Sequence, residues 1–357
     1  MKCIIMAGGK GTRMWPISRQ NKPKQFQAFT SDKTMFQETY LRMRKRFAIA
    51  DIYVSTNDEY VPEVEREIIE LPKQNIISEP AVRGTASSFA LAVARVAAEN
   101  ESEIMAMFPA DHFVKHSDIL LAAIERGEKF LSEHPKHIVT FGIVPKYPET
   151  GYGYIESKKK TFENFHGIFP VERFVEKPDA MTAQKYIDAK TFYWNSGMYM
   201  FRADAMQEKF RKYIPDTYRR LERIKKAVGT GVYAAVLEEE YPQMDKINIE
   251  YAVVENDVEV AVIPLDDMGW SDVGSWASLK DALSENSLEH FVRGEHVDFN
   301  SENLLVYGSK KLITTIGVKD LIIVDSEDAI LICDRNKAQM VSDVVKKLEA
   351  SNKVKLL

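Results

Sequence analysis

Residues 7–26 read AGGKGTRMWPISRQNKPKQF and come directly after a short apolar run, residues 3–6, that is typical of a β-strand. Gly8, Gly9 and Gly11 allow a tight turn here, because glycine has no Cβ to hinder it. Successive N–H groups in such a turn can surround a phosphate group. This stretch therefore predicts a phosphate-binding loop at the end of the first strand.

Two cations in the same stretch favour a polyphosphate ligand. Arg13 and Lys24 supply positive charge that backbone dipoles alone do not, and charge-assisted hydrogen bonds to phosphate are strong. A glycine-rich turn by itself is more often a plain connection between a strand and a helix. With both cations attached, the loop is better suited to a triphosphate.

The glycine spacing argues against two other nucleotide-binding loops. The P-loop pattern GxxxxGK[ST] does not occur in this stretch. The dinucleotide pattern GxGxxG also fails, because counting from Gly9 the third glycine position falls on Met14. A P-loop NTPase and a dinucleotide-dependent dehydrogenase are therefore disfavoured.

Outward from the loop, short apolar runs alternate with segments whose apolar residues recur at helical spacing. The strand-like runs are residues 3–6, 52–55, 75–77, 104–108 and 138–141, and the helical segments are 36–47, 85–98 and 119–131. This alternation predicts an α/β fold with a mostly parallel central sheet and helices on both faces. Ligands of such sheets bind beyond the carboxyl ends of the strands.

After Pro145 the pattern changes to one that predicts a mixed extension of the sheet. Extended segments are expected at 152–156, 171–175, 197–201 and 259–263, and helices at 181–189, 215–226, 248–254 and 274–283. The helix at 274–283 is expected to end the main domain.

Four short strands and a helix are expected at the end of the chain. The strands are placed at 304–307, 312–315, 321–324 and 330–333, and the helix at 337–348. This spacing suits a β-helix-like appendage or a plain meander equally well. We expect two domains, 1–284 and 285–357, and the strand edges of the second suggest a homodimer.

Composition bounds the partners of the 357-residue chain. Lys and Arg number 48 against 53 Asp and Glu, a net charge of −5 that lacks the basic surface of nucleic-acid-binding proteins. No apolar run approaches the ~20 residues of a membrane helix. Cys3 and Cys333 lie in apolar runs and suggest buried thiols in a reducing cytoplasm.

Residues 7–26 resemble the signature of the sugar-phosphate nucleotidyltransferases, and the Trp15-Pro16 and Pro23-Lys24-Gln25-Phe26 details resemble the mannose-1-phosphate guanylyltransferases among them. The resemblance continues in ordered blocks. These blocks are Glu79-Pro80 with Thr85-Ala86, Phe108-Pro109-Ala110-Asp111-His112, Thr150-Gly151-Tyr152-Gly153-Tyr154-Ile155, Glu176-Lys177-Pro178, Trp194-Asn195-Ser196-Gly197 and Trp270-Ser271-Asp272-Val273-Gly274-Ser275-Trp276.

The resemblance implies a Rossmann-like nucleotidyltransferase domain that makes GDP-mannose and pyrophosphate from GTP and α-D-mannose 1-phosphate with Mg²⁺. It further implies a β-rich C-terminal appendage, and a monofunctional enzyme without the isomerase domain of bifunctional relatives. Two alternatives stay open. One is the same chemistry on another hexose 1-phosphate or nucleoside triphosphate, and the other is a non-catalytic regulatory subunit that binds nucleotide-sugar.

The resemblance also implies roles for individual residues. Arg13 and Lys24 match the catalytic cations of the family, and Asp111 and Asp272 match its metal-binding positions. The implied nucleotide-binding residues are Ala7, Gly8, Gly9, Gly11, Thr12, Arg13, Glu79, Gly84, Thr85 and Asp111. The implied sugar-phosphate-binding residues are Gly153, Glu176, Lys177 and Asn195.

Four of these positions, and His112, carry a further expectation. Glu79 could accept hydrogen bonds from both N1–H and N2–H₂ of guanine, or be an exposed residue before Pro80. Gly84 replaces an asparagine that is common in the family. Without their flanking motifs, Asp111 and Asp272 would be read as N-caps of helices, and His112 is expected to be structural.

Overall fold

The computed structural model describes residues 1–9, 11–284, 289–308 and 311–357. They form two compact units. The first comprises Met1–Gly8, Leu41–Pro109 and His116–Met268, and the second comprises Gly9–Tyr40, Ala110–Lys115 and Gly269–Leu357. The expected boundary between 284 and 285 adjoins residues 285–288, which lie outside the described part of the chain.

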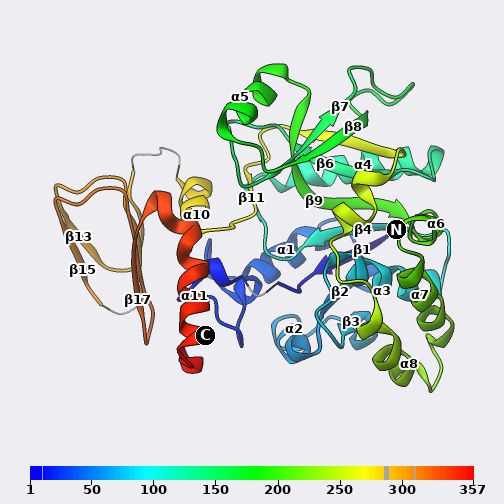
Figure 1. Cartoon of the computed structure of the whole chain (residues 1–357), viewed down its shortest axis with the longest axis horizontal. Helices are drawn as coiled ribbons and strands as arrows, with labels where there is room; N and C mark the ends of the chain where they lie inside the picture. The colour runs from blue at the N-terminus through cyan, green and yellow to red at the C-terminus, as the bar shows by residue number, and fades with distance from the viewer. Residues whose placement is uncertain (10, 285–288, 309–310) are drawn as a thin grey trace. The chain divides into compact units, whose positions relative to one another are not determined.

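A nine-stranded sheet forms the centre of the first unit, in the order β3-β2-β1-β4-β9-β6-β10-β8-β7 (Figure 1). Its strands are β1 (Lys2–Met6), β2 (Ile52–Asn57), β3 (Ile76–Glu79), β4 (Ile104–Pro109), β6 (Ile138–Ile143), β7 (Gly153–Ser157), β8 (Phe169–Glu176), β9 (Phe192–Arg202) and β10 (Val260–Leu265).

The sheet is mostly parallel, as the alternation of strands and helices predicts. β1 pairs in parallel with β2 and β4, β2 pairs with β3, and β10 pairs with β6. β9 runs antiparallel between β4 and β6, β8 runs antiparallel to β10, and β7 runs antiparallel to β8 and β9. Only β8 and β9 therefore oppose the common strand direction.

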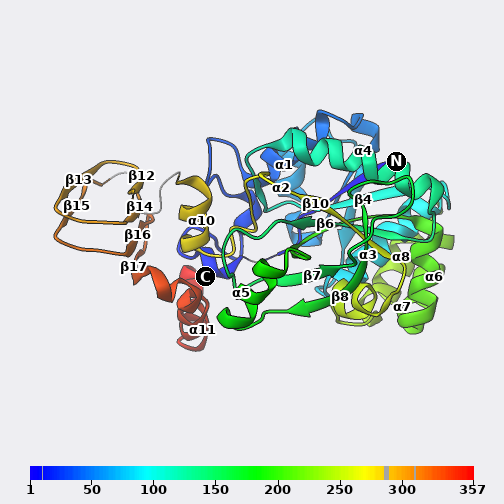
Figure 2. The ribbon, with the colours of Figure 1, turned by 90° about the horizontal axis from the view of Figure 1, so that it is seen from above.

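Helices cover both faces of this sheet. Figure 2 shows α4 on one side and α7 and α8 on the other. The helices of this unit are α2 (Val61–Glu67), α3 (Thr85–Ala97), α4 (Ser117–Glu133), α5 (Ala180–Ala189), α6 (Ala203–Tyr213), α7 (Pro215–Ala227), α8 (Tyr233–Glu240) and α9 (Ile249–Ala252). The sequence did not predict α2, α6 or α8. α3 is the most buried, because small and apolar residues occupy nearly its whole circumference.

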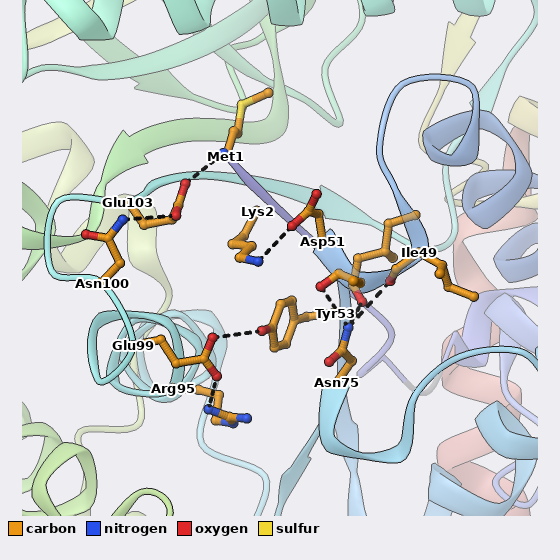
Figure 3. Close-up of polar contacts among 12 residues, drawn as sticks. Met1, Lys2, Ile49, Asp51, Tyr53, Asn75, Arg95, Glu99, Asn100 and Glu103 are labelled. Atoms are coloured by element: carbon orange, nitrogen blue, oxygen red, sulfur yellow. Dashed lines mark hydrogen bonds and ion pairs between the residues drawn. The ribbon is translucent and has the colours of Figure 1, made fainter.

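Polar contacts hold the amino-terminal edge of the parallel strands (Figure 3). The N-terminal ammonium of Met1 lies 2.7 Å from Glu103, and Lys2 Nζ lies 2.7 Å from Asp51. The buried Asn75 amide donates to the carbonyl of Ile52 at 2.8 Å. These bonds satisfy polar groups at the edge opposite the carboxyl ends, where a ligand of this fold binds.

The second unit contains a β-helix-like module, not a meander. β12 (Phe291–Arg293), β14 (Leu305–Tyr307) and β16 (Leu321–Asp325) stack in parallel, and β13 (His296–Phe299) pairs in parallel with β15 (Ile313–Ile316). Parallel neighbours require a full turn of chain between them, whereas a meander pairs successive strands in opposite directions. Among the described strands of this module, β17 (Ile330–Asp334) alone pairs antiparallel, with β16.

The remaining elements of the second unit are short. They are η1 (Thr12–Met14), η2 (Lys24–Phe26), β5 (Phe113–Val114), β11 (Trp270–Ser271), α10 (Trp276–Leu283), η8 (Arg335–Met340), α11 (Val341–Ala350) and η9 (Val354–Leu356), while α1 (Met35–Arg44) spans the border with the first unit. The predicted helix at 337–348 is thus a 3₁₀ helix followed by an α-helix. None of the helices in the described ranges is long and apolar enough to cross a membrane.

Candidate active site

Lys24 makes buried polar contacts with two other segments of the second unit. The residue is only 4% exposed, and its ammonium reaches Oδ2 of Asp111 at 2.8 Å and also donates to the backbone carbonyl of Asp272. The residue begins η2 directly after Pro23, whose extended backbone leads into the short helix. One buried cation therefore joins the two segments that carry the predicted metal ligands.

This contact contributes to the charge state of Asp111. Burial alone would raise the pKa of its carboxyl, but the Lys24 ammonium, His112 and the hydrogen bonds to the carboxylate together lower the pKa below the ordinary value. Asp111 is therefore ionised at neutral pH, as a ligand of a divalent cation must be.

Neither predicted metal ligand caps a helix in the described part of the chain. Helix α10 is capped by Ser275, whose hydroxyl and that of Ser278 form a capping box, and α4 begins after His116. Oδ1 of Asp272 instead accepts the N–H of Gly274 at 2.8 Å. The cap interpretation is therefore wrong for Asp111 and Asp272.

The chemistry of the two carboxylates fits a divalent metal ion. Carboxylate oxygens are the donors that Mg²⁺ takes, with one or two from protein and the rest from phosphates and water. Within the described residues there is no group of three or more His, Cys, Asp or Glu side chains placed to hold a metal. A metal at Asp111 and Asp272 would therefore depend on substrate oxygens as well.

Gly11 brings the glycine-rich loop against Lys24. Its backbone is left-handed, with φ of 59°, and a Cβ at this position would lie 2.3 Å from Cβ of Lys24. Only glycine accommodates both conditions. Thr12 and Arg13 then form η1, and Arg13 Nη1 donates to Oε1 of Gln339 at 2.9 Å.

The loop residues before Gly11 differ in how their backbones are used. The N–H of Ala7 donates to Ser55 at 2.7 Å, and its carbonyl accepts the hydroxyl of Thr56 at 2.9 Å. Ala7 therefore anchors the start of the loop to β2. Gly8 and Gly9 are exposed, and no described atom beyond their chain neighbours lies within 4 Å of a Cβ built on either. The backbones of Gly8 and Gly9 are therefore accessible.

Glu79 is buried, so the interpretation as an exposed residue is wrong. Its side chain is 5% exposed and accepts three hydroxyl hydrogen bonds: Ser55 to Oε1 at 2.8 Å, and Ser88 and Tyr241 to Oε2, each at 2.7 Å. Burial and the Glu79 carboxylate both raise the pKa of Tyr241, so its hydroxyl stays a donor.

These hydroxyls limit what Glu79 can do for a base. A carboxylate has about four lone-pair positions, two on each oxygen. Both positions of Oε2 are used and one remains on Oε1. Glu79 can thus accept one more bond in this conformation. The predicted pair of bonds to guanine N1–H and N2–H₂ requires Ser88 or Tyr241 to move.

The backbone conformation explains why glycine, and not the asparagine common in the family, occupies position 84. Its backbone has φ of 96° and ψ of 170°, a conformation that only glycine adopts readily. A Cβ here would lie 2.8 Å from the carbonyl oxygen of Ile247. Thr85 follows, and its hydroxyl accepts the N–H of Ile249 at 2.8 Å. The start of α3 is therefore packed against residues 247–249.

The predicted sugar-phosphate residues lie on adjacent strands of the first unit. Gly153 on β7 is paired with Glu176 on β8, and Oε1 of Glu176 occupies the space 2.6 Å from where a Cβ of Gly153 would be. Gly153 thus leaves room for Glu176. Lys177 follows with φ of 42°, and both Glu176 and Lys177 are exposed.

Asn195, on β9, belongs to a network that the sequence did not reveal. Its Nδ2 donates to the hydroxyl of Tyr199 at 3.2 Å, and that hydroxyl donates to Oε1 of Glu250 at 3.0 Å. Burial raises the pKa of Glu250, and the nearby charge of Glu176 raises it further. Glu250 and Tyr199 are therefore candidate sugar-site residues. The sequence predicted a helix at 248–254 but no functional role for either residue.

The structure groups the predicted residues by unit. The base and sugar candidates lie in the first unit, with Ala7 and Gly8; Gly9, Gly11, Thr12, Arg13, Lys24, Asp111 and Asp272 lie in the second. His112 accepts a hydrogen bond from the indole of Trp270 at 3.2 Å, which fits its expected structural role. The hydroxyl partners of Glu79 were missed, because isolated serines and a buried tyrosine carry no motif.

Comparison with known proteins matches two families to successive parts of the chain. The family described as nucleotidyl transferase matches residues 2–287, and the family described as mannoseP isomerase/GMP-like beta-helix domain matches residues 294–348. The mannose-1-phosphate guanylyltransferases of Escherichia coli K12 and Salmonella montevideo are both 38% identical over 356 residues, covering 98% of this chain and 74% of each relative.

A solved structure agrees over nearly the whole length. The crystal structure described as mannose-1-phosphate geranyltransferase from Thermus thermophilus has a TM-score of 0.87 and 30% identity, covering 98% of this chain and 99% of that one. The chain therefore belongs to the nucleotidyl transferase family, among its mannose-1-phosphate guanylyltransferases.

Proposed function

We propose that this protein forms GDP-mannose and pyrophosphate from GTP and α-D-mannose 1-phosphate. A phosphate oxygen of the sugar attacks the α-phosphorus of GTP, the new P–O bond forms, and the bond from the α-phosphorus to the oxygen bridging to the β-phosphate breaks. The names of the relatives support the choice of mannose 1-phosphate and a guanine nucleotide as substrates. The observation that carries the proposal is the buried Lys24 ammonium held between Asp111 and the carbonyl of Asp272.

This reaction requires positioning and charge neutralisation more than proton transfer. A phosphate monoester is already ionised at neutral pH, so its oxygen needs no general base. We propose that Lys24 neutralises charge on the α-phosphate or the incoming phosphate and that Arg13 binds the triphosphate. Fixed cations of this kind stabilise charge that develops in the transition state without reorganising.

Members of this family generally use a divalent metal ion. We propose Mg²⁺, held by Asp111 and Asp272. When bound, it would neutralise phosphate charge and orient the reacting phosphates. Lys24 Nζ already donates to Oδ2 of Asp111. A metal ion would therefore bind the other carboxylate oxygen of Asp111 or compete with the Lys24 ammonium for Oδ2.

The remaining predicted residues keep their proposed roles. Gly8, Gly9, Gly11 and Thr12 would surround the triphosphate, with Ala7 as their anchor. Glu79, Gly84 and Thr85 would shape the base site. Gly153, Glu176, Lys177 and Asn195 would bind mannose 1-phosphate, with Glu176 and Asn195 taking the hydroxyls and Lys177 the phosphate.

We further propose that residues 1–284 form the catalytic domain and 285–357 a β-helix-like module. A cytoplasmic location is supported by Cys3 and Cys333, which are both free thiols. Thiols of cytoplasmic proteins stay reduced.

The decisive test is to incubate the protein with mixed nucleoside triphosphates, mixed hexose 1-phosphates and Mg²⁺, and to identify products by mass spectrometry. GDP-mannose as the main product supports the proposal. Another nucleotide-sugar would show the same chemistry on other substrates, and binding without any product would identify a regulatory subunit.

The Lys24→Ala variant tests the role of Lys24 in the same assay. It should lower turnover by about 10²-fold or more, because one fixed electrostatic donor is commonly worth ~2.7–4 kcal/mol in the transition state. Lys22→Ala removes an exposed lysine two residues earlier and should leave turnover unchanged. Near-normal turnover in a folded Lys24→Ala protein would overturn the role of Lys24.

A further inference from the structure

The C-terminal segment of the chain contacts the signature stretch through a set of side-chain bonds within the second unit. Arg13 Nη1 donates to Oε1 of Gln339 at 2.9 Å. Trp15 Nε1 donates to the carbonyl of Leu356 at 2.7 Å, and the guanidinium of Arg19 donates to the same carbonyl. These partners lie more than three hundred residues apart in sequence. The contacts join the predicted phosphate-binding region to the last helices.

Apolar packing supports these bonds. Met14 and Trp15 lie in one buried cluster with Ala338, Val341 and Val345. Further members of this cluster are Phe29, Met35, Val273, Trp276, Leu279 and Leu331. Figures 1 and 2 both show α11 beside the N-terminal segment of the second unit. The last helices are therefore packed on Met14 and Trp15 by a shared core and not by surface contact alone.

Arg13 and Gln339 are each fixed by a buried neighbour. Arg13 precedes Met14, which is 1% exposed, and Gln339 follows Ala338, which is 2% exposed. Both neighbours belong to the same cluster. The backbones at Arg13 and Gln339 are therefore held in place, so pairing of the two side chains costs side-chain entropy but little further backbone entropy.

We propose that residues 335–357 are part of the nucleotide site, and that Gln339 is a positioning residue for Arg13. The segment supports η1, and the Gln339 carbonyl group orients the guanidinium before a triphosphate binds. A neutral acceptor suits this task, because it holds the cation without opposing the negative charge of the phosphates. The inference rests on the proposed function only through the assignment of Arg13 to the triphosphate.

A double-mutant cycle on the full chain tests this inference. GTP kinetics and GTP affinity by calorimetry are measured for the wild type, Gln339→Ala, Arg13→Ala and the double variant. Loss of the orienting bond should raise the KM and Kd for GTP about 3- to 10-fold with little change in kcat. In the Arg13→Ala background, Gln339→Ala should change nothing further. Equal effects in both backgrounds, or no effect in either, would overturn the proposal.

Two more variants sharpen the result. Gln74→Ala removes an exposed amide of the first unit, outside every proposed binding residue, and should leave GTP affinity unchanged. Gln339→Glu keeps an acceptor for Arg13 but adds a negative charge, so it should weaken GTP binding more than Gln339→Ala does. Wild-type affinity in Gln339→Glu would contradict the orientation role.

The two proposals fail in distinguishable ways. If the wild type binds GTP but makes no GDP-mannose, the proposed function fails and the calorimetric cycle still decides the inference. If GDP-mannose forms and the cycle is additive, only the inference fails.

Discussion

The hydroxyl of Tyr241 donates a 2.7 Å hydrogen bond to Oε2 of Glu79, across 162 residues of sequence. Both side chains are buried, with Tyr241 fully inaccessible and Glu79 5% exposed. Ser55 and Ser88 complete the set of donors. A buried carboxylate lowers the stability of a fold unless it is hydrogen-bonded. The three hydroxyl donors therefore allow Glu79 to be buried at the predicted base site.

Tyr241→Phe tests the contribution of these hydroxyl donors to stability. Removing one of three donors from a buried carboxylate should lower the free energy of unfolding by about 1–3 kcal/mol. Tyr53→Phe is the matched control, because its hydroxyl makes only a 3.4 Å contact with Glu99. Urea unfolding of both variants measures the difference, and equal stabilities would contradict the account of Glu79. The freed lone pair should also let Glu79 accept both guanine donors, so GTP affinity should not fall with stability.

Gly84→Asn restores the residue that is common in the family at this position. The substitution should destabilise the protein, because a backbone in this glycine-only region costs roughly 1–3 kcal/mol and the new Cβ would also meet Ile247. Gly229→Asn is the control: its φ of 77° is also positive, but no described atom beyond its chain neighbours would lie within 4 Å of the new Cβ. A lower melting temperature for Gly84→Asn than for Gly229→Asn is expected, and the reverse order would refute the clash.

Glu250→Gln should change stability in a pH-dependent way. The folded state raises the pKa of Glu250 above its ordinary value of 4.5, so the native protein binds this proton more tightly than the unfolded chain. Stability contributed by this group therefore falls as pH rises from 4.5 through the folded pKa. At neutral pH the variant should be more stable than the wild type, and the advantage should vanish below the ordinary pKa. Urea midpoints across this range test the sign.

The same variant separates stability from sugar binding. Gln keeps an oxygen to accept the Tyr199 hydroxyl, so the Asn195 network stays connected. If Glu250 serves the sugar site, the KM for mannose 1-phosphate should rise while the KM for GTP stays constant. A variant that is both more stable and fully active would restrict Glu250 to a structural role.

Asp272→Asn should raise the Mg²⁺ concentration needed for half-maximal rate, because the site loses an anionic ligand. The amide oxygen can still accept the N–H of Gly274, so the local turn should survive. Asp267→Asn, at an exposed residue a few positions earlier, is the control. An unchanged metal titration for Asp272→Asn would leave Asp272 with its turn role alone.

Local patterns in the sequence were enough to place most of the sheet. The alternation of apolar runs and helical segments located β1, β2, β3, β4 and β6 to within a few residues, because burial on both faces requires continuous apolar strands. β12 and β13 were missed, since their side chains are mostly exposed or half-buried and leave no apolar alternation. The choice between a β-helix and a meander needed the pairing itself, because both use the same short strands.

The sequence alone also does not determine which residue caps a helix. Asp272 has a side chain suited to capping and lies just before a helix, yet Ser275 takes that role. Several residues near a helix start compete for the cap, and only the backbone conformation decides which one is placed to accept the N–H groups.

By itself, the sequence determined the glycine loop, the βα alternation and the cations Arg13 and Lys24, because turn chemistry and hydrophobic periodicity act over a few neighbouring residues. Only the tertiary structure decided that Lys24 pairs with Asp111, that three hydroxyls surround Glu79, and that Gln339 holds Arg13. These contacts join residues far apart in the chain. They form because burial must satisfy each polar group with whatever partner the packed fold brings near, and no local pattern specifies that partner.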